Sequence, residues 1–128
     1  MARPDETFGI TNLTRGSLPR LPFCRMKDTV LGKNYTLSLV FVGDTRSRNL
    51  NKEHRDKNKP TDILSFTLTD SEGEIFINLK RARMNAKKHG ATELKFLKRL
   101  FIHGLLHLKG MDHGSTMDSE EAKFLKRF

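Results

Sequence analysis

Cysteine is nearly absent from the sequence. Cys24 is the only one among 128 residues, so no intrachain disulfide can form. A metal site built from several thiolates is excluded for the same reason. This usage fits a reducing, intracellular compartment and predicts no disulfide-bonded partner.

Long apolar runs are also missing. Residues 37–42 form one of the longest, and they fall far short of the roughly 20 residues that a membrane-spanning helix needs. The N-terminus has no apolar stretch of the kind found in signal peptides. We therefore expect a soluble, cytoplasmic protein that does not contact a membrane.

Acidic residues are few relative to basic ones. The 24 Lys and Arg outnumber the 15 Asp and Glu, which gives a formal net charge of +9. Such a charge is typical of proteins that bind polyanions such as nucleic acid, and solubility alone is the alternative interpretation. The length of the chain fits one compact domain, so we expect residues 1–128 to form a single domain.

Hydrophobic periodicity and breaker residues predict both strands and helices. Strands are expected at residues 8–13 (at a sheet edge), 35–42, 62–68 and 74–78, with the last two paired as a hairpin. Helices are expected at residues 22–31, 44–55 and 79–90, from the cap Thr92 onward, and from 118 or 119 to 128. Because both faces of the strand at 35–42 are largely apolar, both should be covered.

A predicted helix near the C-terminus carries two histidines. His103 and His107 are four residues apart, so they are neighbours on one face, with Cβ atoms about 5–6 Å apart. Gly110 can adopt the left-handed conformation that ends a helix, which would turn His113 toward the same point. Three histidines can bind one zinc ion and leave a fourth position for water, as in catalytic zinc sites. Asp112 could accept a hydrogen bond from a ligand imidazole.

Other interpretations of the histidines are open. A histidine in a core helix is commonly a satisfied buried side chain, and a closed structural site could recruit Cys24 or a carboxylate as its fourth ligand. The spacing also matches the metzincin protease pattern H-E-x-x-H-x-x-G-x-x-H, in which the glutamate is the general base. Gly104 occupies the glutamate position here. Peptide or amide hydrolysis is therefore the second choice, because its proton shuttle is missing.

Two separated blocks carry motifs beyond the histidine spacing. Residues 103–113 read HGLLHLKGMDH, and residues 50–66 read LNKEHRDKNKPTDILSF. The first block resembles the H-G-x-L-H-L-x-G-Y-D-H signature of the YbeY endoribonucleases, which are bacterial and organellar rRNA maturation factors. The second resembles the L-N-x-x-x-R-x-K-x-x-P-T-D-V-L-S-F segment of the same family.

Weaker similarities extend this resemblance over residues 50–121. Residues 73–77, GEIFI, are similar to the G-D-I-x-I strand of the family, and Met117 and Glu121 also fit. The sequence departs from the family at Met111, where tyrosine is common, and at Glu74, where aspartate is usual. Neither departure affects a predicted zinc ligand.

The resemblance implies a zincin-like α+β domain. We expect a roughly four-stranded mixed sheet, about five helices, and one zinc ion on a C-terminal helix and the turn after it. The implied ligands are His103, His107 and His113. Arg55, whose guanidinium can fork onto phosphate oxygens, completes the predicted catalytic set.

The resemblance also implies a function. It predicts a single-strand-specific endoribonuclease that acts at the 3′ end of small-subunit rRNA and in ribosome quality control. RNA is then the substrate, and the ribosome or its proteins are partners. The remaining alternative is a non-enzymatic assembly factor that binds rRNA while zinc only anchors the C-terminal turn.

Basic side chains are concentrated in residues 80–99. This segment contains Glu93 as its only acid and eight basic residues: Lys80, Arg81, Arg83, Lys87, Lys88, Lys95, Lys98 and Arg99. We interpret the segment as a track for RNA, with a solvated helix face as the alternative. Because few aromatic residues are interleaved, sequence-specific readout of RNA bases is not expected.

Overall fold

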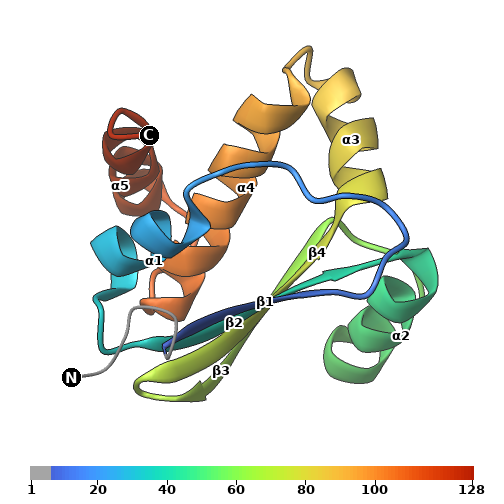
Figure 1. The fold of residues 1–128 in the computed structure, drawn as a ribbon, viewed down its shortest axis with the longest axis horizontal. Coiled ribbons are helices and arrows are strands. Elements are labelled where there is room, and N and C mark those ends of the chain that lie inside the picture. The colour runs from blue at the N-terminus through green and yellow to red at the C-terminus, as the bar shows by residue number, and fades with distance from the viewer. Residues whose placement is uncertain (1–6) are drawn as a thin grey trace.

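The computed structural model describes residues 7–128. Over this range the elements follow in the order β1 (Phe8–Asn12), α1 (Phe23–Leu31), β2 (Thr36–Val42), α2 (Asp44–Arg55), β3 (Ile63–Thr69), β4 (Glu72–Asn78), α3 (Leu79–Lys88), α4 (Glu93–Leu108) and α5 (Ser115–Leu125) (Figure 1). These four strands and five helices confirm the predicted α+β class. No helix within residues 7–128 has the length and apolar character to cross a membrane.

One mixed sheet contains all four strands. Its order is β1-β2-β4-β3, in which β1 and β4 run parallel to β2 and β3 runs antiparallel to β4. The first strand therefore lies at an edge, as predicted. The predicted hairpin is also present, but its turn is shorter than expected, since only Asp70 and Ser71 separate β3 from β4.

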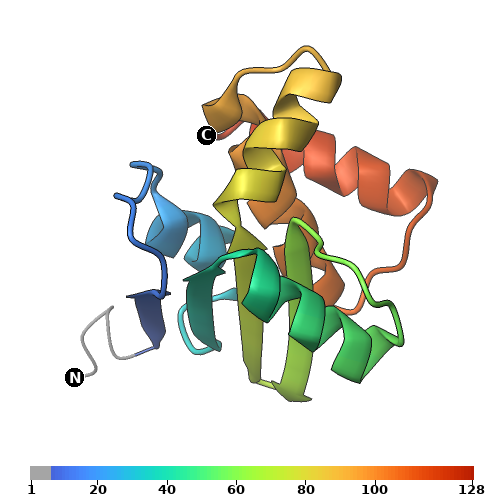
Figure 2. The same ribbon diagram turned by 90° about the vertical axis from the view of Figure 1, so that its right-hand side faces the viewer.

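The helices cover both faces of the sheet. α1 and α4 lie on one face and α2 lies on the other, while α5 packs against α4 (Figure 1). Figure 2 shows α2 in front of the sheet and α4 behind it. The prediction that both faces of β2 are covered is confirmed, because every residue from Leu39 to Val42 is buried.

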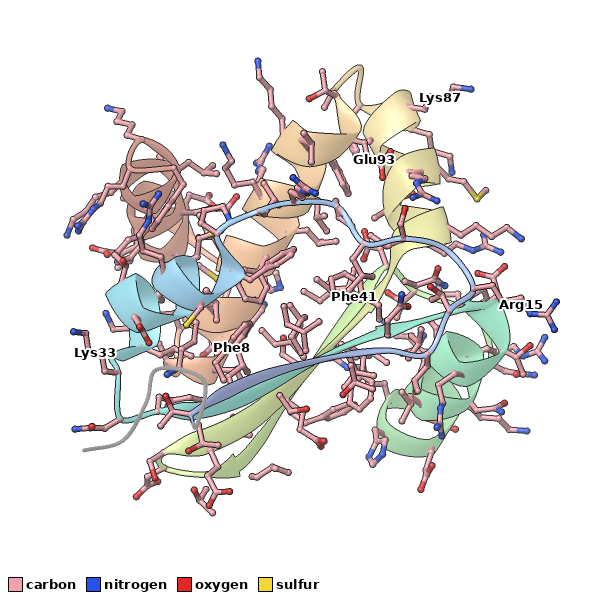
Figure 3. All side chains as sticks on the ribbon, in the orientation of Figure 1. Phe8, Arg15, Lys33, Phe41, Lys87 and Glu93 are labelled. Atoms are coloured by element: carbon pink, nitrogen blue, oxygen red, sulfur yellow. The ribbon has the colours of Figure 1, made fainter. Side chains whose placement is uncertain are left out.

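The main core fills the space between the sheet and helices α1 and α4. Leu39 and Phe41 of β2 have no exposed surface, and neither has Phe101 of α4. Phe23 of α1 stands edge-on to the rings of Phe41 and Phe101, at centroid distances of 5.8 and 5.1 Å. Figure 3 shows Phe41 in the interior of the molecule. This packing holds α4 against the sheet and so fixes where its histidines lie.

The last helix begins earlier than the sequence predicted. α5 starts at Ser115 and ends at Leu125, instead of running from 118 or 119 to 128. Its first turn is closed by the backbone N–H of Asp118, which donates to the carbonyl of Gly114 at 3.0 Å. The prediction started at the first acidic residue, Asp118, whereas the helix begins three residues earlier, after the N-cap Gly114, and no side chain caps it.

Candidate metal centre

The local sequence explains why α4 presents two histidines together. The side chain of Thr92 accepts a hydrogen bond from the backbone N–H of Lys95 at 3.2 Å, which caps the helix as predicted. The apolar residues of α4 then face the core. His103 and His107, one helical turn apart, are half-buried at the edge of this buried face.

A tight turn after α4 brings the third histidine to the same place. Gly110 has φ of 99°, the left-handed conformation predicted for it. The ring of His113 lies 4.9 Å from that of His103 and 4.7 Å from that of His107, measured between centroids. One ring nitrogen from each of the three side chains can be chosen so that all three lie within 4.8 Å of one another. The structure thus brings together the histidines that the sequence singled out.

The nitrogen positions fit a metal ion. Nε2 of His103 and Nε2 of His107 are 3.2 Å apart. Two imidazole nitrogens in a tetrahedral zinc shell, each about 2.0–2.1 Å from the ion, are separated by about 3.3 Å. The cluster is also open on one side, because His113 is exposed. The three histidines are therefore consistent with a metal site that leaves room for a further ligand.

A carboxylate orients the first histidine. Nδ1 of His103 donates a hydrogen bond to Oε2 of Glu121 at 3.0 Å, which leaves Nε2 to face the other two rings. Oε1 of Glu121 accepts a hydrogen bond from Nε of Arg99 at 2.7 Å. A ligand histidine commonly gives its second nitrogen to a carboxylate in this way, which fixes both tautomer and orientation.

This arrangement differs from the sequence hypothesis for Asp112. That residue was chosen because it precedes His113, but its side chain is exposed and the structure gives it no hydrogen bond to a histidine. The carboxylate comes from Glu121 instead, on the buried side of α5. Side chains of residues adjacent in the sequence seldom point toward the same site. A residue on a helix that packs against the site, such as Glu121, can do so.

The environment keeps His107 in the neutral form that a metal requires. Burial lowers the pKa of His107, and the neighbouring His103, His113 and Arg55 lower it further. A hydrogen bond with the backbone of Met111 acts in the opposite direction. A neutral imidazole offers a lone pair, so the lowered pKa makes His107 available as a metal ligand.

Gly104 marks a close contact between α4 and β3. A Cβ atom at this position would lie 2.8 Å from Cδ1 of Ile63 and 3.1 Å from Oγ of Ser65. A side chain at residue 104 would have to displace the side-chain ends of Ile63 and Ser65 at this close approach. The carboxylate that metzincins place here is therefore absent and, in addition, has no space.

Arg55 lies near the cluster on a different element. It is the last residue of α2, its side chain is exposed, and its charge acts on His107. It also lines a cavity of about 480 Å³ between the end of α2, the start of β3 and helix α3. The structure thus brings the predicted arginine into the neighbourhood of the three histidines.

Comparison with known proteins agrees with the geometry. The family model described as "Endoribonuclease YbeY" matches residues 22–127. This chain belongs to the YbeY family. The match includes all three histidines, Arg55 and Glu121.

Individual YbeY relatives are moderately similar. The proteins named Endoribonuclease YbeY from Treponema denticola and Thermodesulfovibrio yellowstonii are 39% and 42% identical over 75% and 70% of this chain. The aligned parts cover 68% and 60% of those two proteins, so the chain spans about two thirds of their length or less. A solution structure of a Thermotoga maritima protein aligns with a TM-score of 0.68 and 26% identity, and it covers 93% of this chain and 87% of the other.

Half of the basic residues in the segment 80–99 are paired with acids. Arg83 pairs with Glu93, Arg99 with Glu121, and both Lys80 and Arg81 with Asp44. The other four, Lys87, Lys88, Lys95 and Lys98, make no ion pair within residues 7–128, although Lys98 donates a hydrogen bond to the carbonyl of Phe128. An RNA track along this segment stays a prediction.

Proposed function

We propose that this protein is a zinc-dependent endoribonuclease that cuts single-stranded RNA. Its substrate in the cell would be the 3′ region of small-subunit rRNA, and its role would be in ribosome maturation and quality control. The observation that carries the proposal is the convergence of three histidine nitrogens within 4.8 Å of one another. Membership of a family described as endoribonucleases supports the same reaction.

The proposed metal site is formed by His103, His107 and His113, which would hold one zinc ion. When bound, zinc supplies Lewis-acid chemistry, which offsets negative charge on the reacting phosphodiester. Glu121 holds the His103 ring in place through Nδ1, and Arg99 holds Glu121. These two residues therefore position a proposed metal ligand.

Arg55 is proposed to bind the phosphate that reacts. A guanidinium can donate two parallel hydrogen bonds to phosphate oxygens and stabilise the extra charge that develops as the nucleophile adds. Arg55 is the last residue of α2, its side chain is exposed, and no ion pair within residues 7–128 competes for it. The guanidinium of Arg55 is therefore available to bind an RNA phosphate.

Two nucleophiles fit this site, and the products distinguish them. If water attacks phosphorus, the products carry an ordinary phosphate and a hydroxyl. If the ribose 2′-hydroxyl attacks, its proton is lost, the P–O5′ bond breaks, and a 2′,3′-cyclic phosphate remains on the upstream fragment. Mass spectrometry of the fragments decides between these routes.

The test of the proposal compares three preparations on single-stranded fragments of small-subunit rRNA. Zinc-loaded wild type should cleave, whereas chelated protein and His107→Ala should not, once the fold of each has been verified. The variant must be purified identically, since contaminating ribonuclease is the main hazard. Cleavage by both the chelated protein and His107→Ala would overturn the proposal.

A non-catalytic role is the alternative outcome. If none of the three preparations cleaves RNA but all bind it, the protein is an rRNA-binding assembly factor that works with the ribosome in the cytoplasm. A peptidase is disfavoured because residue 104 has no room for a general base. Chelator-sensitive cleavage of a peptide library would nevertheless establish one.

A further inference from the structure

The cavity beside Arg55 has a lining that the cleavage chemistry does not explain. It holds about 480 Å³, a size typical of small-molecule sites, and none of its lining residues is a histidine of the cluster. Its apolar lining residues are Pro60, Ile63 and Leu64. The lining also contains five cationic side chains: Arg55, Lys57, Lys59, Arg81 and Lys88.

Most of this positive charge is uncompensated. Among residues 7–128, only one of the five cations makes an ion pair, since Arg81 binds Asp44 with an Nε–Oδ1 distance of 3.0 Å. The other four are exposed. The lining contains one acid, Asp62, whose Oδ2 accepts a hydrogen bond from Nδ2 of Asn85 at 2.9 Å. The amide is neutral, so Asp62 keeps one negative charge against the four unpaired cations. The cavity therefore offers four available cations to an anionic ligand.

The loop that carries two of these lysines is held in place by buried side chains. Nδ2 of Asn51 donates to the carbonyl of Lys59 at 2.9 Å. Oγ of Ser47 donates to the carbonyl of Thr61 at 2.8 Å and accepts from its N–H at 2.9 Å. Ser47 and Asn51 are each only 2% exposed. Because buried side chains hold the loop by hydrogen bonds at Lys59 and Thr61, the backbone of the loop is in place before a ligand binds.

Ile63 connects the cavity to the metal centre. Its side chain lines the cavity, and its Cδ1 lies against Gly104, the residue after His103. A polyanion bound in the cavity would thus continue toward the histidine cluster.

We propose that this cavity is a second phosphate-binding site, which holds the backbone of the RNA strand on nucleotides next to the one that is cleaved. The inference rests on the proposed function for the identity of the ligand. Lys57, Lys59 and Lys88 bind phosphates that do not react, while Arg55 stands between the two sites. The lining has no aromatic side chain on which a base could stack, so the site binds the phosphates of the RNA backbone and does not recognise bases.

The test uses a variant that removes charge only from the cavity. The cavity variant carries Lys57→Gln, Lys59→Gln and Lys88→Gln, all at exposed positions. The matched control carries Lys33→Gln, Lys126→Gln and Arg127→Gln, which remove the same charge from exposed positions elsewhere. Figure 3 places Lys33 at the opposite end of the molecule from α2 and α3.

Binding to RNA of different lengths gives the readout. Zinc-loaded proteins are titrated with 2′-O-methyl oligonucleotides, from a dinucleotide to a dodecamer, across a range of salt concentrations. The cavity variant should bind the dodecamer about tenfold more weakly, and its salt slope should fall by about 2, because each phosphate contact on a single strand contributes about 0.7. Its affinity for the dinucleotide, and the affinity of the control for every length, should remain within about twofold of wild type.

Several results would overturn the inference. One is an equal loss in the cavity variant and the control, which would indicate non-specific charge. A second is an equal loss of affinity for the dinucleotide and the dodecamer, which would indicate a site for single nucleotides. A third is that polyglutamate competes with the dodecamer for the protein as strongly as unlabelled RNA does. Wild type that binds no dodecamer would also reject it.

The same preparations separate this inference from the proposed function. Absence of cleavage in wild type contradicts the nuclease proposal, yet the length-dependent binding difference can still be measured. Normal cleavage of a dinucleotide by the cavity variant, with a raised KM and unchanged kcat for the dodecamer, supports both. If wild type cleaves RNA but the cavity variant shows no length-dependent loss of affinity, only the cavity proposal is rejected.

Discussion

Glu121 and His103 are joined by a hydrogen bond of 3.0 Å between Oε2 and Nδ1, although the two residues lie on different helices. Arg99, one turn before His103 on α4, binds the second oxygen of the same carboxylate. The packing of α5 on α4 therefore sets the direction of a proposed metal ligand. The side chain of Glu121 is only 8% exposed, so water competes little for this contact.

Replacement of Glu121 should weaken metal binding. We expect Glu121→Gln to lower zinc affinity about tenfold or more, as loss of such an outer carboxylate commonly does. Zinc affinity is measured by competition with a chromogenic chelator. Glu120→Gln is the control, because Glu120 makes only a 3.9 Å ion pair with Lys123 on the surface. Equal affinity in both variants would show that Glu121 has no positioning role.

Loss of Arg55 should slow the reaction without loss of metal. Arg55→Ala should reduce kcat for RNA cleavage about 100-fold, since a group that stabilises developing charge typically contributes this much. Lys52→Ala, on an exposed position of the same helix, should leave kcat unchanged. Zinc content, measured by atomic emission, should be one ion per chain in both. A wild-type kcat in Arg55→Ala would remove this residue from the mechanism.

A side chain at residue 104 should disturb the contact between α4 and β3. Gly104→Glu places a carboxylate against Ile63 and Ser65 and should lower the free energy of unfolding by about 3 kcal/mol. Gly104→Ala requires the tip of Ile63 to move and the side-chain ends of Ser65 and Ile75 to shift slightly, so it should stay within about 1 kcal/mol of wild type. Urea denaturation measures both. A stable Gly104→Glu variant would show that the close approach is not required.

Asp44 should make stability dependent on acid pH. Hydrogen bonds from Arg81 and Asn78 hold the pKa of Asp44 well below its usual range. A carboxyl whose pKa is lowered by folding stabilises the protein above its unfolded pKa of about 3.9, and this contribution is lost as the pH falls. Asp44→Asn should therefore cost about 1–2 kcal/mol at pH 7, and the difference from wild type should shrink below about pH 4.

The control for Asp44 is Asp70→Asn in the exposed turn between β3 and β4. It should change the free energy of unfolding by less than about 0.5 kcal/mol at either pH. A constant difference between wild type and Asp44→Asn from pH 7 to pH 3 would contradict the lowered pKa.

The sequence predicted what is local along the chain. The spacing of His103 and His107 and the glycine at 110 determine the cluster through one helix and one turn, so periodicity was sufficient. The pairing of Glu121 with His103 depends instead on how two helices pack, and a pattern of 3.6 residues carries no information about that. The sequence analysis named Asp112 because it adjoins His113, and noted Glu121 only as a residue that fits the family pattern.

The cavity could not have been predicted for a related reason. Its lining comes from α2, the loop that follows, β3 and α3. Charge counting pointed to residues 80–99, but many of those cations are paired with acids elsewhere in the fold, as Arg81 is with Asp44 at a separation of 37 residues. Only the three-dimensional structure shows which charges are compensated.

The most direct test of the central claim is a titration of metal-free protein with zinc, in which bound zinc and the initial rate of RNA cleavage are measured on the same samples. The account predicts that both rise together and stop at one zinc per chain, and that His107→Ala shows neither rise. A cleavage rate that is already maximal before zinc is added, or that does not follow bound zinc, would contradict a catalytic role for the three histidines.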